Sequence, residues 1–226
     1  MGNLFSMTIT ENLKFIHNQL SAKVKLVAVS KTKSIEQIYE AYQTGHRAFG
    51  ENKIQELVKK WQELPKDIEW HFIGHLQSNK VKQIVPFISL IHSIDSYKLL
   101  ATINKEAEKW NRVVPVLLEF HVASEESKFG LTLSGADEML SSPDIESLKN
   151  VYITGVMGMA TFTDDQDLIK SEFRQLYNIF HFLKGKYFFH NNQFCEISMG
   201  MSDDYPIAIA EGSTIVRIGS KIFGAR

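Results

Sequence analysis

A lysine and two segments rich in serine and glycine are the residues best suited to chemistry. Lys31 follows the apolar run "LVAVS", which is typical of a buried strand, so its amine would emerge where that strand ends. Enclosure by neighbouring strands would lower the pKa of that amine, and a neutral amine is a nucleophile toward aldehydes. The segments "SMGMS" (198–202) and "RIGSK" (217–221) offer hydroxyls and accessible backbone N–H groups of the kind that bind phosphate. Together they predict a phosphorylated aldehyde or ketone held by Lys31 as a Schiff base.

Each of these residues also has an ordinary structural interpretation. Glycine and serine are common in turns, and most lysines are solvated. Arg217 could form a surface ion pair, or it could donate into the mouth of a barrel, because a buried arginine is costly without a partner. Two ligand classes remain open at this point, namely pyridoxal phosphate and phosphosugars.

The elements that must position these residues alternate along the chain. Strand-like runs separated by helical patterns predict a parallel sheet with helices outside it. Eight units in 226 residues predict an α/β fold, a single (β/α)8 TIM-type barrel domain over residues 1–226 with an extra N-terminal helix around 8–21. A doubly wound open sheet is the alternative, but no glycine-rich nucleotide turn follows the first strand. The predicted strands are 24–30, 47–51, 70–74, 90–95, 113–123, 151–159, 194–200 and 214–219.

Helix starts are indicated by capping residues. Ser34 begins a capping-box pattern, and Asp95 or Ser96 can cap the helix that carries Leu99, Leu100 and Ile103. Thr163 with Gln166 is predicted to cap the long helix that follows the sixth strand. A short helix is expected over 205–211, ended by a glycine.

Composition narrows the function classes. The net charge is -1, from 25 basic and 26 acidic side chains, so nothing favours nucleic acid or an anionic membrane as a partner. Cys195 is the single cysteine, it is expected to be buried, and a reducing cytoplasmic compartment fits. No secretory signal and no apolar run of about 20 residues is visible. No metal site is predicted, because metal-ligand spacing is absent around His71, His75, His92 and His121.

Six motifs carry a family resemblance. The segments "LVAVSKTK", "FGEN", "WHFIGHLQSNK", "EESKFGL", "SMGMS" and "VRIGSKIFGAR" occur in order from about residue 10 to the C-terminus. In these motifs the chain closely resembles the YggS/PROSC family of pyridoxal phosphate homeostasis proteins. The resemblance implies a barrel akin to the N-terminal domain of alanine racemase, with pyridoxal 5'-phosphate bound at its mouth. It also implies a cofactor carrier without an established reaction of its own.

The resemblance implies roles for ten residues. Lys31 would hold the cofactor as an internal aldimine, and Arg217 would face the pyridine nitrogen. The remaining contacts would come from Ser198, Gly219 and Ser220 at the phosphate, from the backbone of Met199 and Gly200 beside it, from Asn52 near the ring and its 3-oxygen, and from His75 and Ser78 at the rim. Two residues near the end of the fifth strand, Glu119 and His121, depart from the family pattern.

The predicted function is a non-catalytic pyridoxal phosphate carrier in intracellular vitamin B6 homeostasis or cofactor delivery, with no catalytic residues. The alternative is a pyridoxal phosphate-dependent enzyme such as an amino-acid racemase, which would need a base on each face of the cofactor and a site closed to water. A phosphosugar aldolase is a third possibility, against which the resemblance argues. Expected partners are apo-enzyme acceptors, the expected state is a monomer or weak dimer, and Lys128 is a hypothetical participant in cofactor entry and release.

Overall fold

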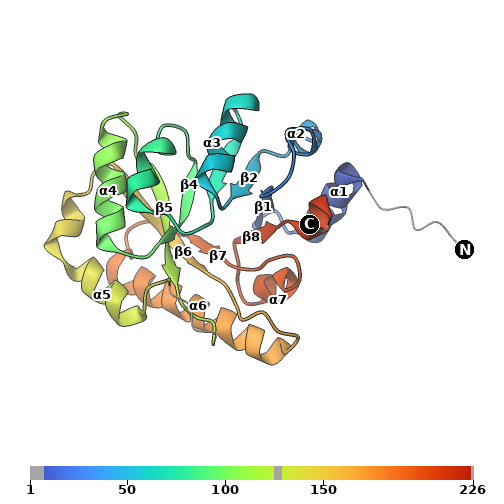
Figure 1. Ribbon diagram of the computed structural model, residues 1–226. Helices are drawn as coiled ribbons and strands as arrows, with labels where there is room; N and C mark the ends of the chain where they lie inside the picture. The colour runs from blue at the N-terminus through green and yellow to red at the C-terminus, as the bar shows by residue number, and fades with distance from the viewer. Residues whose placement is uncertain (1–7, 125–128, 225–226) are drawn as a thin grey trace, which may run out of the picture.

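Eight parallel strands form a closed barrel in the computed structural model, which describes residues 8–124 and 129–224 (Figure 1). The strands pair in sequence order, and β1 also pairs with β8, so the predicted (β/α)8 barrel is confirmed and the open sheet is excluded. The strands are β1 (Lys25–Val29), β2 (Ala48–Glu51), β3 (Glu69–Phe72), β4 (Leu90–Ile94), β5 (Val114–Phe120), β6 (Val151–Gly158), β7 (Glu196–Ser198) and β8 (Ile215–Ile218).

Helices surround the barrel, and the predicted extra helix precedes β1. This helix, α1, packs against the short α8 near the C-terminal end, so segments from the two ends of the sequence lie side by side (Figure 1). The helices are α1 (Ile9–Gln19), α2 (Ile35–Gln43), α3 (Ile54–Glu63), α4 (Tyr97–Glu108), α5 (Leu133–Ser141), α6 (Gln166–Tyr187), α7 (Tyr205–Ala210) and α8 (Ser220–Phe223), with 3-10 turns η1 (Ser78–Gln83) and η2 (Pro143–Ser147).

Capping side chains fix most helix starts where the sequence indicates them. Ser34 forms the predicted capping box of α2, and Ser96 caps α4. The prediction that Thr163 caps α6 is wrong. The cap is Asp165, whose carboxylate accepts from two backbone N–H groups of the first turn, whereas the Thr163 hydroxyl accepts from Asp165 N in the preceding loop. An ionised carboxylate is favoured at this position because it also interacts with the helix dipole.

Two apolar clusters bury the sheet. The larger fills the space between the strands and the helices. The smaller lies inside the barrel, where it consists of Val27, Leu90, Leu117, Met157 and Ile215. Burying a side chain of this size stabilises the fold by roughly 1.5–3 kcal/mol. The interior is therefore packed rather than hollow, and ligands must bind at its ends.

The expected burial of Cys195 is wrong, because this residue is exposed. β7 is shorter than the predicted run 194–200 and begins only after Cys195. Along this segment Phe194 is buried, Cys195 is exposed and Ile197 is buried, so the thiol points away from the apolar core. Within residues 8–124 and 129–224, no helix is long and apolar enough to span a membrane.

Candidate functional site

A cavity of about 990 Å³ opens where the strands end at their carboxyl termini, and we call it the mouth cavity. Residues after β1, β2, β3, β5, β6, β7 and β8 line it, which is the face where barrels of this type place their ligands. Six predicted site residues meet here although they come from distant parts of the sequence. They are Lys31, Asn52, His75, Arg217, Gly219 and Ser220.

Four other predicted residues do not line the mouth cavity. Ser78 begins η1, and Ser198 and Met199 are fully buried. Gly200 has φ of 94°, a conformation that favours glycine, and a Cβ at this position would lie 2.6 Å from the Ala208 Cβ. Gly200 therefore allows α7 to pack closely against the loop after β7.

Hydrogen-bond donors gather where β8 leads into α8. Gly219 N donates to Ser202 Oγ at 3.2 Å, and both residues line the mouth cavity. The N–H groups of Ser220 and Lys221 lie in the first turn of α8 and have no acceptor among the residues described. A Cβ on Gly219 would lie 3.2 Å from Val29 O, so a side chain would crowd this approach. The arrangement suits an anion with several oxygen atoms.

Arg217 forms the floor of the mouth cavity. Its side chain is buried, with Nη1 donating to Ser198 O at 2.8 Å and to Ser198 Oγ at 2.6 Å, and Nη2 donating to Gly158 O at 3.1 Å. The surface ion pair considered from the sequence is therefore excluded. Burial lowers the pKa of Arg217 to about 10, so the guanidinium stays charged at neutral pH.

A chain of hydrogen bonds continues from Arg217 along the barrel interior. Ser198 Oγ lies 2.9 Å from His92 Nδ1, and His92 Nε2 lies 2.9 Å from His71 Nδ1. Burial lowers the pKa of His71 to about 3 and that of His92 well below its usual value, so both rings are neutral. Arginine can only donate, which leaves the Ser198 hydroxyl hydrogen free to point at His92. His71 in turn lines a second cavity of about 800 Å³ that also contains residues at the amino ends of several strands.

Glu119 places a carboxyl group on the wall of the mouth cavity. It is 8% exposed, and its Oε2 atom has no hydrogen-bond partner within the described part of the chain. Burial, helped by the charge of Asp95 and opposed by Arg217, raises the pKa of Glu119 to about 7. Its protonation therefore changes near neutral pH, beside the guanidinium that forms the floor.

The rim of the mouth cavity combines the predicted His75 with residues to which the sequence assigned no role. His75 is on this rim, where its ring stacks on Phe129 at 3.9 Å between centroids. The loop after β6 contributes Phe162, which is 87% exposed. Lys33 also lines the cavity, with Nζ near the carbonyl oxygens at the end of α8. Lys128 lies outside the described residues.

Two other sequence predictions concern His121 and metal binding. His121 lines a groove between α5 and α6 rather than the mouth cavity. In the segments the structure describes, no cluster of three or more His, Cys, Asp or Glu side chains is placed to hold a metal ion.

The fold and the mouth cavity define a barrel of the alanine racemase type with a lysine at the end of β1. The family model "Alanine racemase, N-terminal domain" matches residues 6–226. An alanine racemase from E. faecalis superposes with a TM-score of 0.71 at 15% identity, covering 96% of this chain and 58% of that one, which shows a shared fold.

Closer relatives narrow the family. The pyridoxal phosphate homeostasis protein of Pasteurella multocida is 38% identical over 97% of this chain and 98% of its own length. That of Schizosaccharomyces pombe is 35% identical, covering 97% and 93%. PipY of Synechococcus elongatus, solved with pyridoxal phosphate bound, is similar at 34% identity with a TM-score of 0.86, covering 96% of this chain and 100% of that chain. The chain belongs to the family of the pyridoxal phosphate homeostasis proteins.

Proposed function

We propose that this chain binds pyridoxal 5'-phosphate in the mouth cavity and acts as a carrier in intracellular vitamin B6 homeostasis or cofactor delivery. One observation carries the proposal. A primary amine, on Lys31, and an anion-binding turn, at Gly219 and Ser220, line the same cavity. Pyridoxal phosphate carries an aldehyde and a phosphate on one ring, which match these two features.

The residues present fit this cofactor. When bound, pyridoxal phosphate supplies an electrophilic aldehyde carbon and an electron-withdrawing ring. Lys31 would supply the amine for the aldehyde, and Arg217 would offer its positive charge to the pyridine nitrogen, since both residues line the cavity. That charge would disfavour a proton on the nitrogen and so weaken the ring as an electron sink. Asn52 would contact the ring and its 3-oxygen, and His75 would contribute to the rim of the site. Ser78, at the start of η1, would support this rim without lining the cavity.

The phosphate contacts we propose differ slightly from those that the family resemblance implies. Gly219 and Ser220 keep their role, because both line the cavity beside donors without acceptors. Ser202 replaces Ser198 as the second hydroxyl, because its Oγ faces Gly219 and its hydrogen remains available. Ser198, with its neighbours Met199 and Gly200, acts indirectly, since the Ser198 oxygens hold the guanidinium of Arg217.

A carrier fits this site better than an enzyme. Phe162 and Met159 on the rim are 87% and 44% exposed, so the mouth is accessible from solvent. An accessible mouth suits loading and transfer to an apo-enzyme acceptor, whereas proton removal from a substrate carbon benefits from excluding water. The fold is shared with alanine racemases, so racemase activity is the alternative that the experiment must test.

The test is borohydride reduction of the protein after loading with pyridoxal phosphate, followed by peptide mapping. The reduced cofactor should be found on the peptide that contains Lys31, and Lys31→Ala should remove this label. A label found only on other lysines would contradict the proposal. In parallel, the protein should restore activity to an apo-enzyme without turning over amino acids. Racemisation that is abolished by Lys31→Ala would instead support the enzyme.

A further inference from the structure

The turn after β1 holds Lys31 between two anchored peptide groups. Thr32 has φ of 67°, an unusual conformation for a β-branched residue, so contacts must stabilise the turn. Its N–H donates to Glu56 Oε2 at 2.8 Å. On the other side of Lys31, the carbonyl oxygen of Ser30 accepts from Lys60 Nζ at 2.9 Å. Both anchors therefore come from the same helix, α3.

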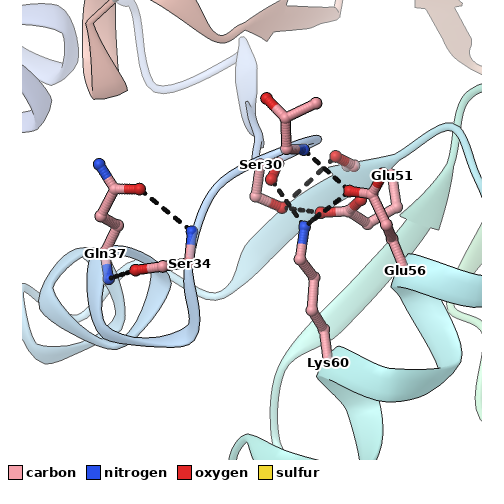
Figure 2. A network of polar contacts seen from close by, with 8 residues as sticks. Ser30, Ser34, Gln37, Glu51, Glu56 and Lys60 are labelled. Carbon is pink, nitrogen blue, oxygen red and sulfur yellow. Dashed lines mark hydrogen bonds and ion pairs between the residues drawn. The ribbon is translucent and has the colours of Figure 1, made fainter. Parts of the chain in front are cut away.

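Lys60 is the centre of this network. Its side chain is 6% exposed, and Figure 2 shows it extending from α3 toward Ser30, Glu51 and Glu56. Nζ lies 2.8 Å from Glu51 Oε1 and 3.3 Å from Glu56 Oε2, in addition to its bond to Ser30. An ammonium group has three donors, and here all three are used. The Ser30 hydroxyl also donates to Glu51 Oε1 at 2.5 Å.

Neither a gain in stability nor contact with a ligand explains why the chain buries this charged network. Burial raises the pKa of Glu51, an effect opposed by Lys60, and Glu51 Oε2 is without a hydrogen-bond partner in the described segments. Apolar residues of similar volume often replace a buried ion pair without loss of stability. None of Glu51, Glu56 and Lys60 lines the mouth cavity. What the cluster does contact is the backbone on both sides of Lys31.

We propose that Glu51, Glu56 and Lys60 form a positioning cluster for Lys31. By fixing the Ser30 carbonyl and the Thr32 N–H, the cluster orients the Lys31 side chain into the mouth cavity. The inference rests on the proposed function, because Lys31 must there react with an aldehyde. The amine adds to the carbonyl carbon, a carbon–nitrogen bond forms and the oxygen leaves as water, so no further reactant is required.

The test separates positioning from stability by means of two variants. Lys60→Met leaves Glu51 buried without its partner, and should lower the urea midpoint and slow the reaction with pyridoxal phosphate. The double variant Glu51→Gln with Lys60→Met removes both buried charges and should recover most of the urea midpoint. Its bond formation, followed by stopped-flow absorbance, should remain about tenfold or more slower than in the unmodified chain.

Binding of 4-deoxypyridoxine phosphate serves as a second readout. This probe has the ring and the phosphate but no aldehyde, so its affinity does not depend on Lys31 reacting. The double variant should bind it within about twofold of the unmodified chain, because the cluster does not line the cavity. Lys59→Met, an exposed position next to Lys60, is the matched control and should change none of the readouts.

Glu56 provides an independent variant if the double variant does not fold. Glu56→Ala removes the acceptor of the Thr32 N–H and should slow bond formation, whereas Glu56→Gln keeps an acceptor and should restore it. Glu63→Ala, exposed on the same helix, is the control. Bond formation at the unmodified rate in both the double variant and Glu56→Ala would overturn the positioning role alone. A chain that never forms the bond at Lys31, even unmodified, would instead refute the proposed function.

Discussion

Removing single hydroxyls should show which serines contact the phosphate and which support the ring contact. Ser202 and Ser220 line the mouth cavity, whereas Ser198 is fully buried and bonded to Arg217 and His92. A hydrogen bond to a charged group contributes about 1.5–3 kcal/mol, which corresponds to about 10- to 150-fold in affinity. Ser202→Ala and Ser220→Ala should therefore each weaken pyridoxal phosphate binding by a factor in this range.

Comparison with unphosphorylated pyridoxal makes the experiment decisive. Pyridoxal lacks the phosphate, so Ser202→Ala and Ser220→Ala should leave its affinity nearly unchanged in equilibrium absorbance titrations. Ser198→Ala should weaken both ligands by a similar factor, because it acts through Arg217 on the ring. The reasoning is refuted if Ser198→Ala discriminates against the phosphate while Ser202→Ala and Ser220→Ala affect both ligands equally.

Three further predictions concern buried groups. The pKa of Glu119, raised from 4.5 to about 7, means that the folded state binds more protons than the unfolded chain, so stability falls as pH rises through this window. Glu119→Gln should therefore raise the free energy of unfolding at pH 8 by up to about 3 kcal/mol, with no gain below pH 4.5. Urea titrations at the two pH values measure this difference, and equal effects at both would exclude the raised pKa. Gly155→Ala should destabilise the fold by at least about 3 kcal/mol in the same assay, because its Cβ would lie 1.8 Å from Glu196 O, and a smaller loss would mean that β7 can move. His92→Phe removes the partners of the Ser198 hydroxyl and of His71, and should lower the free energy of unfolding by about 2 kcal/mol or more, whereas an unchanged urea midpoint would show that water replaces them.

The order of the elements could be predicted because each strand and helix has its own local signal. Strand-like runs have apolar β-branched residues, and helix starts have capping side chains, so neither needs knowledge of distant residues. Once the barrel is inferred, Lys31 and Gly219 must lie at the face where the strands have their carboxyl ends, since parallel strands all end at one face.

The direction of the side chains at the end of β7 could not be predicted from the sequence in the same way. "SMGMS" contains two serines, and only the pleat and the pairing of β7 with β6 and β8 determine which one faces the barrel interior. Ser198 turns inward to Arg217, and Ser202 lies beyond the strand beside Gly219. The same reason explains Cys195, whose exposure depends on where β7 begins.

The hydrogen-bond chain along the interior was hidden for a different reason. His71, His92 and Ser198 lie on three different strands. β3 and β4 are paired neighbours, whereas β7 is three strands further along the barrel from β4. Histidines spaced in this way resemble neither a metal motif nor a catalytic motif. Only closure of the barrel brings the His92 and Ser198 side chains within 2.9 Å.

Barrel closure also assembles most of the proposed cofactor site. β1 and β8 are the first and last strands, yet they pair directly, with Val27 opposite Arg217 and Ala28 opposite Ile218. Lys31 therefore follows one strand, whereas Arg217 lies on the adjacent strand and Gly219 and Ser220, the proposed phosphate contacts, follow that strand. In an open sheet with the same strand order, these two strands would be the opposite edges, and Lys31 could not share a cavity with Ser220. The β1–β8 pairing therefore brings Lys31 next to the proposed phosphate contacts, and substitutions that weaken this pairing should weaken pyridoxal phosphate binding in an equilibrium absorbance titration.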